Sequence, residues 1–468
     1  MKYTYKNKHL IFIFFIFILL SLVISLGHVD RWVLSEQIAM AENFEKNGTF
    51  YPNLLHKNIS GVSVYPPGIA FISFLLLKLN LNSYIFEILL LSSVGFIVLF
   101  FVIQKKLVSQ FFKVEISNNE LLIYIILIST LLPRWYDYSL QLKPELFAFT
   151  LGLLWLLIIK NIDKNSYVSH LVMGIIFTLP IIFKQQYLSF IAGYIFYSFF
   201  NLSKKNIFTS IGIVLSFIFS FGIFNFDNVF YWSFEVLSDD GLNSILIILS
   251  EHYLILLRLT FFICFCFLIE IKLNINKYLL KGSLIKSIKG NPLISIMFFS
   301  FIANYLSFFK NGGTGGNIET ALVFLTPLFM IIFQKINLRF LILFAFIGTL
   351  SLLPKAFTSI EDYINMLNFK NSINKLEVKP NVKIVTDSNS YYASRFLLEE
   401  YDVENYFTLS LLAEKSNTPK LLNYYEENLL ESEFILLIEN SLSNRIFISD
   451  LDLEILYEDK SSIAAKNY

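Results

Sequence analysis

The sequence is poor in cysteine, histidine and charge. Its 468 residues include two cysteines and five histidines, and 16% are charged, with a formal net charge of +1. Cys264 and Cys266 lie two positions apart in an apolar run, where helical side chains point about 200° apart, a geometry that disfavours a disulfide between them. The histidines are scattered, without metal-ligand spacing on one helix. The sequence therefore gives no support for a disulfide scaffold, a histidine metal site, a nucleic-acid binder or an acidic tail.

Apolar residues dominate instead. The chain is 55% hydrophobic and 17% aromatic, and apolar runs of about 20 residues, the length that crosses a bilayer as a helix, recur along it. They predict an all-α polytopic transmembrane bundle of about eleven spans within residues 1–354. The expected spans are 9–27, 83–104, 119–133, 146–160, 170–183, 187–200, 207–226, 250–271, 292–309, 318–334 and 338–354.

The first apolar run, 10–26, decides the orientation. It follows Lys2, Lys6 and Lys8, and it is longer than the roughly 7–15 residues of a signal-peptide core, so an uncleaved span is favoured over a cleaved signal. The N-terminus is then cytoplasmic, and loops rich in Lys and Arg fall on the cytoplasmic side. These loops carry Lys105, Lys106, Lys113, Lys160, Lys164, Lys204, Lys205, Lys272, Lys277, Lys281, Lys286, Lys289, Lys335 and Arg339.

The run from 68 to 79 is too short for a crossing and is expected to form an interfacial helix. If it crossed, the Lys-rich loops would face outward, against the positive-inside rule. It therefore closes a first outer loop, 28–82.

The character of the chain changes after Pro354. The segments 382–387, 433–439 and 453–458 read as short buried strands, with helical patterns at 390–401 and 419–430 between them. This alternation predicts a small α/β domain, 355–468, on the extracytoplasmic side. The region has no nucleotide-binding glycine motif, so a binding or covering domain is the plainer expectation.

Asp30 follows the first span directly and begins a helical pattern that includes Trp32. As an Asp before the first apolar-periodic residue, it fits an ordinary N-cap. A carboxylate at the edge of the hydrocarbon is also partly desolvated, which makes it a better general base near neutral pH. Arg31 would oppose that effect. Tyr65, in a Tyr-Pro-Pro-Gly corner, returns the loop to the membrane, so Asp30 and Tyr65 are expected to border one cavity.

The second outer loop, 133–145, holds Arg134, Lys143 and Glu145. Pro144 followed by Glu145 fits helix initiation with dipole compensation. The functional alternative is a second carboxylate facing Asp30, with Arg134 and Lys143 as phosphate partners.

Two further cations interrupt apolar surroundings. Lys184 lies at the expected outer end of a short span, where a lysine commonly snorkels to the interface. Arg258 lies inside a span and should face the bundle interior or a wet cavity, either paired with Glu251 or holding a lipid phosphate. The glycine-rich 311–317 segment fits a tight turn as well as an anion cradle.

The order and membrane side of these motifs resemble the polytopic glycosyltransferases of the GT-C fold. The resemblance rests on Asp30 after the first span, Gly48-Thr-Phe-Tyr-Pro52, Tyr65-Pro-Pro-Gly68 and Lys143-Pro-Glu145, within roughly residues 9–330. It is greatest to the protein-mannosyltransferase and aminoarabinose-transferase group and their bacterial relatives. Two positions depart from that group, which often has Asp-Glu where this chain has Asp30-Arg31, and Asp where it has Glu145.

The resemblance implies an integral, multi-pass protein of a bacterial plasma membrane. It would transfer a sugar from a polyprenyl-phosphate donor to a lipid, glycan or protein acceptor outside the cytoplasm. Asp30 would be the general base and Glu145 the second catalytic carboxylate. No cofactor is certain, although a divalent metal between these carboxylates is conceivable. The residues expected to bind substrate are Arg31, Trp32, Tyr51, Tyr65, Arg134, Lys143, Lys184 and Arg258, the aromatic ones by stacking on a sugar face.

Two other classes of function compete with the transferase. A transporter or flippase for a lipid-linked glycan would also use Arg258 in a wet cavity, but it needs no carboxylate fixed outside. A non-catalytic assembly protein would use the C-terminal domain for partners and Asp30 only as a helix cap. Substitution of Asp30 separates the three.

Overall fold

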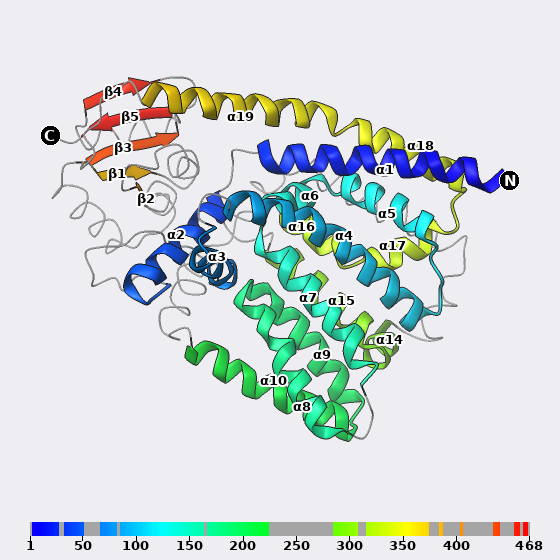
Figure 1. Ribbon diagram of the computed structural model, residues 1–468. Helices are drawn as coiled ribbons and strands as arrows, with labels where there is room; N and C mark the ends of the chain where they lie inside the picture. Colours follow the sequence, from blue (N-terminus) through cyan, green and yellow to red (C-terminus); the bar gives the residue numbers. More distant parts are fainter. Residues whose placement is uncertain are drawn as a thin grey trace, which may run out of the picture.

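The computed structural model describes most of the helical part of the chain and five strands near its C-terminus (Figure 1). The described residues are 2–27, 32–50, 66–81, 85–162, 166–223, 284–307, 315–373, 383–386, 403–405, 434–439, 454–458 and 462–466.

The described part of the chain is predominantly helical. Its first half contains α1 (Lys2–Gly27), α2 (Trp32–Asn47), α3 (Gly68–Lys78), α4 (Ile85–Phe112), α5 (Asn118–Leu131), α6 (Pro133–Leu140), α7 (Pro144–Ile159), α8 (Tyr167–Thr178), the 3-10 helices η2 (Leu179–Ile182) and η3 (Gln185–Tyr187), α9 (Leu188–Phe200) and α10 (Lys204–Ile223). Its second half contains α14 (Leu284–Gly290), α15 (Pro292–Ser307), α16 (Gly315–Val323), α17 (Thr326–Phe333), α18 (Leu338–Leu350) and α19 (Leu353–Ile373).

The helix starts have local causes. At α5, Ser117 accepts a hydrogen bond from the backbone N–H of Glu120, while the Glu120 carboxylate accepts one from the backbone N–H of Ser117. This reciprocal capping box satisfies two backbone donors that helix geometry leaves unpaired. Proline occupies the first turn of α6, α7 and α17, where its missing N–H costs nothing.

Each expected span except 250–271, which lies outside the described residues, coincides with at least one helix. The segment 68–79, expected to lie along the membrane surface, is helical as α3, and its position at that surface stays a prediction. The break expected at residues 184–186 separates η2 from α9. Two boundaries differ from the expectation. The range 318–334 is split between α16 and α17 at Phe324 and Leu325, because Pro327, in the first turn of α17, cannot donate a hydrogen bond to the preceding turn. Pro354 does not end the last helical segment, because it lies in the first turn of α19, where proline is tolerated.

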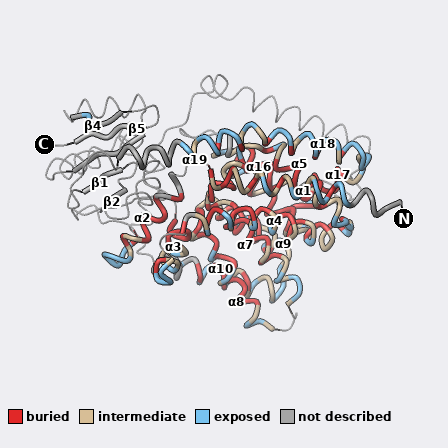
Figure 2. The backbone as a smooth tube through the Cα atoms, turned by 45° about the horizontal axis from the view of Figure 1, so that its top comes forward, coloured by how far each residue is buried: buried red, intermediate tan, exposed pale blue. Residues whose placement is uncertain are grey.

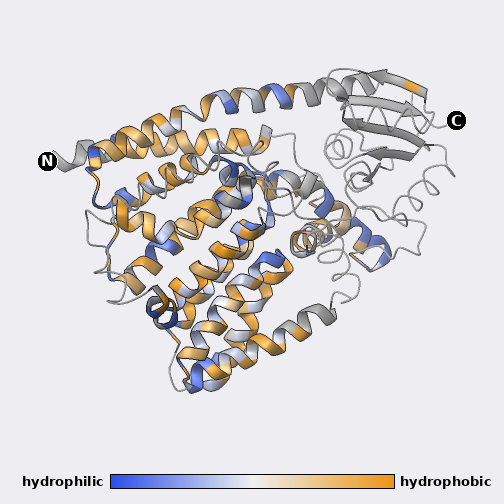
Figure 3. Ribbon diagram, turned by 180° about the vertical axis from the view of Figure 1, so that it is seen from behind, coloured by the Kyte–Doolittle hydropathy of each residue, from blue (hydrophilic) through white to orange (hydrophobic). Residues whose placement is uncertain are grey.

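Three described helical segments are long and apolar enough to cross a membrane singly: Lys8–Gly27, Glu87–Phe112 and Leu338–Ile364. A fourth candidate is the pair α6 and α7, which is bent by 95° between its halves. The count of about eleven crossings thus remains a prediction, because several of the other apolar helices are shorter than one crossing. The helices are largely hydrophobic along their length (Figure 3), and they expose many large hydrophobic side chains. Both features identify an integral membrane protein.

The helices pack closely enough that small residues are required between some of them. Gly174 of α8 and Gly212 of α10 face each other, and a Cβ added to Gly174 would lie 2.1 Å from the carbonyl oxygen of Thr209. Such small-residue contacts let helix backbones approach in a membrane, where lipid contact competes with helix contact. Helices α1 and α19, from the two ends of the helical part, lie side by side (Figure 1). Buried residues concentrate in the helices inside this layer, including α4 and α7 (Figure 2).

The strands form one mixed sheet of order β2-β1-β3-β5-β4. Its members are β1 (Lys383–Thr386), β2 (Val403–Asn405), β3 (Phe434–Glu439), β4 (Glu454–Glu458) and β5 (Ser462–Lys466). β1 pairs in parallel with β2 and β3, whereas β5 pairs antiparallel with β3 and β4. β1, β3 and β4 coincide with the three expected strands, but β2 and β5 were not expected. The helices expected at 390–401 and 419–430 lie outside the described residues, so the α/β organisation remains a prediction.

Candidate functional site

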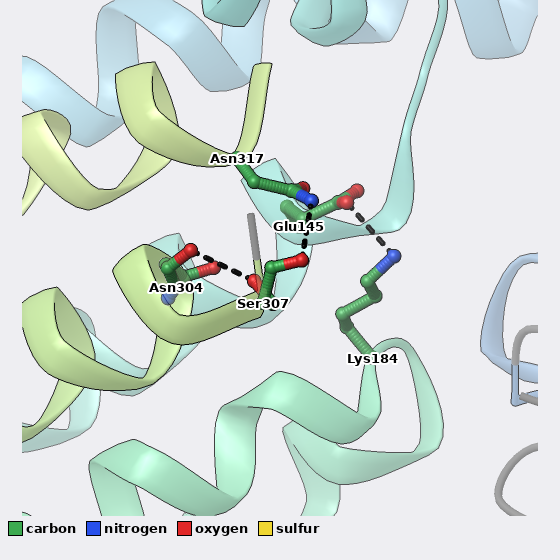
Figure 4. Close-up of polar contacts among 5 residues, drawn as sticks. All are labelled: Glu145, Lys184, Asn304, Ser307 and Asn317. Atoms are coloured by element: carbon green, nitrogen blue, oxygen red, sulfur yellow. Dashed lines mark hydrogen bonds and ion pairs between the residues drawn. The ribbon is translucent and has the colours of Figure 1, made fainter. Parts of the chain in front are cut away.

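A polar cluster lies inside the helical part, where several helices begin or end (Figure 4). Glu145 is in the first turn of α7, directly after Pro144, and Lys184 lies in extended conformation between η2 and η3. The end of α15 and the start of α16 contribute Asn304 and Asn317. Residues from three distant parts of the sequence therefore meet in one place.

The centre of this cluster is an ion pair. Lys184 Nζ lies 2.8 Å from Glu145 Oε1, and the two side chains are 3% and 16% exposed. Glu145 Oε2 is buried and has no hydrogen-bond partner among the described residues. A buried ion pair is costly to desolvate and costlier to break, since removal of one member leaves an uncompensated charge. Each residue thus depends on the other to remain charged in this position.

Amide and hydroxyl groups lie beside the ion pair. Asn304 Nδ2 donates to the carbonyl of Ser300 (2.9 Å), and Ser307 Oγ donates to the carbonyl of Asn304 (2.8 Å). Asn317 Nδ2 donates to the carbonyl of Ser307 (3.3 Å), which ties the start of α16 to the end of α15. In Figure 4 these groups lie on one side of the Glu145 carboxylate and Lys184 on the other.

A second group of charges holds the amphipathic helix α6, which lies in the loop expected between two spans. The Glu319 carboxylate of α16 accepts a hydrogen bond from the backbone N–H of Trp135 (2.9 Å) and another from that of Arg134. Glu319 therefore caps α6 from a different helix, which satisfies donors that α6 itself cannot.

Asp137 of α6 forms an ion pair with Lys355 of α19. Burial raises the pKa of the Asp137 carboxyl, while the Lys355 ammonium and the nearby Arg134 oppose that rise. Asp137, Glu319 and Lys355 were not among the site residues predicted from the sequence. Glu319 could have been found because it is an acidic residue inside an expected span. Such a residue in a membrane protein is expected to have a buried polar or charged partner.

The structure brings two of the predicted site residues together, Glu145 and Lys184. Lys184 does not extend to solvent, so it does not snorkel as the simplest expectation had it. Lys143 is at the N-cap of α7, with its Nζ 3.2 Å from the ring centroid of Tyr138, and Arg134 is exposed at the start of α6. Trp32 is the first residue of α2.

The remaining predicted site residues, Asp30, Arg31, Tyr51, Tyr65 and Arg258, lie outside the described residues. Within the described ranges, no three His, Cys, Asp or Glu residues are grouped so that they could hold a metal ion. A divalent metal between Asp30 and Glu145 stays a prediction, because Asp30 lies outside the described residues.

No family model and no curated protein matches the sequence. The resemblance to the GT-C fold that was inferred from the motifs is nevertheless confirmed, at the level of the fold alone. The solved structure that carries the likeness is ArnT from Cupriavidus metallidurans bound to undecaprenyl phosphate. The match covers 98% of this chain and 98% of that one, with a TM-score of 0.58 and 9% sequence identity.

Proposed function

We propose that this protein is a membrane glycosyltransferase that moves a sugar from a polyprenyl-phosphate donor to an acceptor outside the cytoplasm. The observation that carries the proposal is a fold shared along nearly the whole chain with ArnT, whose structure holds undecaprenyl phosphate. The buried Glu145–Lys184 pair at the helix ends supports it, since a water-poor polar site suits electrostatic stabilisation of a leaving phosphate.

Asp30 is the proposed general base. It removes the proton of the acceptor hydroxyl while that oxygen attacks the anomeric carbon of the sugar, and the bond from this carbon to the lipid phosphate breaks. The leaving phosphate takes the bonding electrons and is stabilised by cations, for which Lys184, Arg258 and Arg134 are the first candidates.

Recognition of the sugar is assigned to the aromatic residues around the first outer loop. Trp32, Tyr51 and Tyr65 offer flat apolar faces on which a sugar ring stacks, with polar tips for its hydroxyls. In the proposed topology, the C-terminal region, 355–468, covers this loop from the extracytoplasmic side. Helix α2, which follows Asp30, lies beside β2 of the C-terminal sheet (Figure 1), an arrangement that supports such a cover.

The direct test is the release of polyprenyl phosphate by purified protein in liposomes. A panel of polyprenyl-phosphate sugars is supplied with a membrane-extract acceptor, and wild type is compared with Asp30→Asn. We expect release with at least one donor, and a loss of about 10²-fold or more in the variant, the usual contribution of a general base.

A matched control is Glu42→Gln, which removes a carboxylate from α2 further along the same helix and should leave release unchanged. Equal turnover in a folded Asp30→Asn protein would remove Asp30 as the base. Absence of turnover with every donor would favour the lipid-linked glycan transporter.

A further inference from the structure

The buried Lys184 already has an anionic partner. Its ammonium lies 2.8 Å from Glu145 Oε1, and the lysine side chain is 97% removed from solvent. A phosphate that binds Lys184 must therefore either displace this carboxylate or share the ammonium with it. The ammonium has three donor protons, so sharing is geometrically allowed, but the two anions then repel each other.

The Glu145 carboxylate is unevenly satisfied. Oε1 contacts Lys184, whereas Oε2 is buried without a hydrogen-bond partner in the described part of the chain. A buried acceptor without a partner carries a desolvation penalty. Lys143 and the backbone N–H of Glu145 also stabilise the charged carboxylate, so Glu145 does not depend on Lys184 alone and can give up its contact with Lys184 to a competing anion.

A second hydrogen-bond donor for the Glu145 carboxylate lies on the side away from Lys184. Asn317, whose amide now donates to the carbonyl of Ser307 over 3.3 Å, lies on the side opposite Lys184 (Figure 4). This bond is long for its kind. An amide with a second donor proton is therefore close to where the displaced carboxylate would turn.

From these contacts we propose that Glu145 is the resident counterion of Lys184, exchanged for the phosphate of the lipid carrier when that carrier binds. The inference rests on the proposed function, because it takes the polyprenyl phosphate head group as the anion. Its consequence is that Glu145 weakens the hold on the released carrier. The released polyprenyl phosphate leaves because the Glu145 carboxylate binds the Lys184 ammonium again.

The effect of charge removal has a definite sign. Glu145→Gln keeps the volume of the side chain but removes the competing charge, so the surroundings of Lys184 become more positive by one unit charge. Polyprenyl phosphate should bind about tenfold more tightly, a modest estimate for one unit charge a few ångströms from the ligand in a buried site. A residue that only held the fold would not tighten binding when lost.

The experiment titrates a short-chain polyprenyl phosphate into the full-length protein in nanodiscs. Wild type, Glu145→Gln, Glu145→Asp and Lys184→Gln are compared, with Glu45→Gln as the matched control because Glu45 forms an exposed pair with Lys78 over 2.9 Å. We expect binding to tighten in Glu145→Gln, to tighten less in Glu145→Asp, to weaken in Lys184→Gln and to stay unchanged in Glu45→Gln.

A second titration with inorganic phosphate distinguishes the source of the anion. A gain with polyprenyl phosphate that inorganic phosphate does not reproduce supports the lipid head group as the partner, whereas an equal gain with both overturns that assignment. Unchanged or weaker binding in a folded Glu145→Gln or Glu145→Asp protein overturns the exchange itself.

The proposed transferase function is tested by a different measurement. If that function is wrong, no polyprenyl phosphate is released from any donor, whatever the binding titrations show. If Glu145→Gln does not fold in the absence of ligand, Glu145→Asp tests the exchange instead. The measurement is the rise in its thermal unfolding midpoint when polyprenyl phosphate binds. That rise must exceed the rise in wild type.

Discussion

Two Glu–Lys pairs of nearly equal length lie in different regions of this protein. Glu145, at the start of α7, and Lys184, just after η2, are 2.8 Å apart, with side chains that are 16% and 3% exposed. Glu45 and Lys78, on α2 and α3, are 2.9 Å apart, with side chains that are 40% and 54% exposed. The contacts are alike in distance, but water screens only the second pair effectively.

The difference teaches that distance alone does not tell what an ion pair does. In the exposed pair, either partner can be solvated when the other is lost, so the pair contributes little to stability. In the buried pair, neither can, and the free energy of the site depends on both remaining charged or on a ligand that replaces one. Asp137 and Lys355, 24% and 29% exposed, lie between these extremes.

The largest effect is expected at the buried pair. Lys184→Gln leaves the Glu145 carboxylate without its counter-charge, and we expect a loss of about 3–5 kcal/mol in the free energy of unfolding. Chemical unfolding in detergent micelles measures it. The double variant Glu145→Gln/Lys184→Gln removes both charges and should recover most of the loss. A double variant as unstable as the single one would show that packing, not charge, is responsible.

An intermediate effect is expected where α6 meets α19. Lys355→Met should cost about 1–2 kcal/mol, because Asp137 stays partly hydrated when its partner is lost. Burial already raises the pKa of Asp137, so the native state binds its proton more readily than the unfolded chain does. Stability therefore falls as the pH rises through that range, and the loss in Lys355→Met should shrink on acidification. A loss independent of pH would contradict this origin.

The smallest effect is expected at the exposed pair. Lys78→Met should change the free energy of unfolding by less than about 1 kcal/mol, and added salt should erase the difference. The same unfolding assay at low and high ionic strength tests both statements. A change as large as that of Lys184→Gln would remove the distinction between the two regions.

The sequence predicted the helical elements well, because their signal is local. Apolar runs and turn residues placed both ends of α7 and α9 within two residues, whereas α1 begins earlier and α4 ends later than the expected spans. The prediction was less accurate at proline, which can either follow the end of one helix or occupy the first turn of the next. The last span was expected to end at Pro354, with a separate domain from 355, but Pro354 lies inside the first turn of α19. Short strands with little apolar pattern, such as β2, were missed because pairing with β1, not their own sequence, makes them strands.

The candidate site was predicted only in part. Glu145 and Lys184 were both named, but as separate residues with separate partners. The cap that Glu319 provides to α6 joins residues 184 positions apart, and nothing in the spacing of the sequence indicates it. Asp30, the residue on which the proposed mechanism depends, was named from its position after the first span and stays a prediction.

By itself, the sequence determined that this is a membrane protein of apolar helices, because crossing a bilayer requires long apolar runs that any reader of the chain can find. It also determined which charged residues interrupt those runs and so need partners. The tertiary structure alone decided which partner each one has. Burial removes water as an alternative, so a charge such as Lys184 must be satisfied by whichever group the fold brings to it, and that group is Glu145.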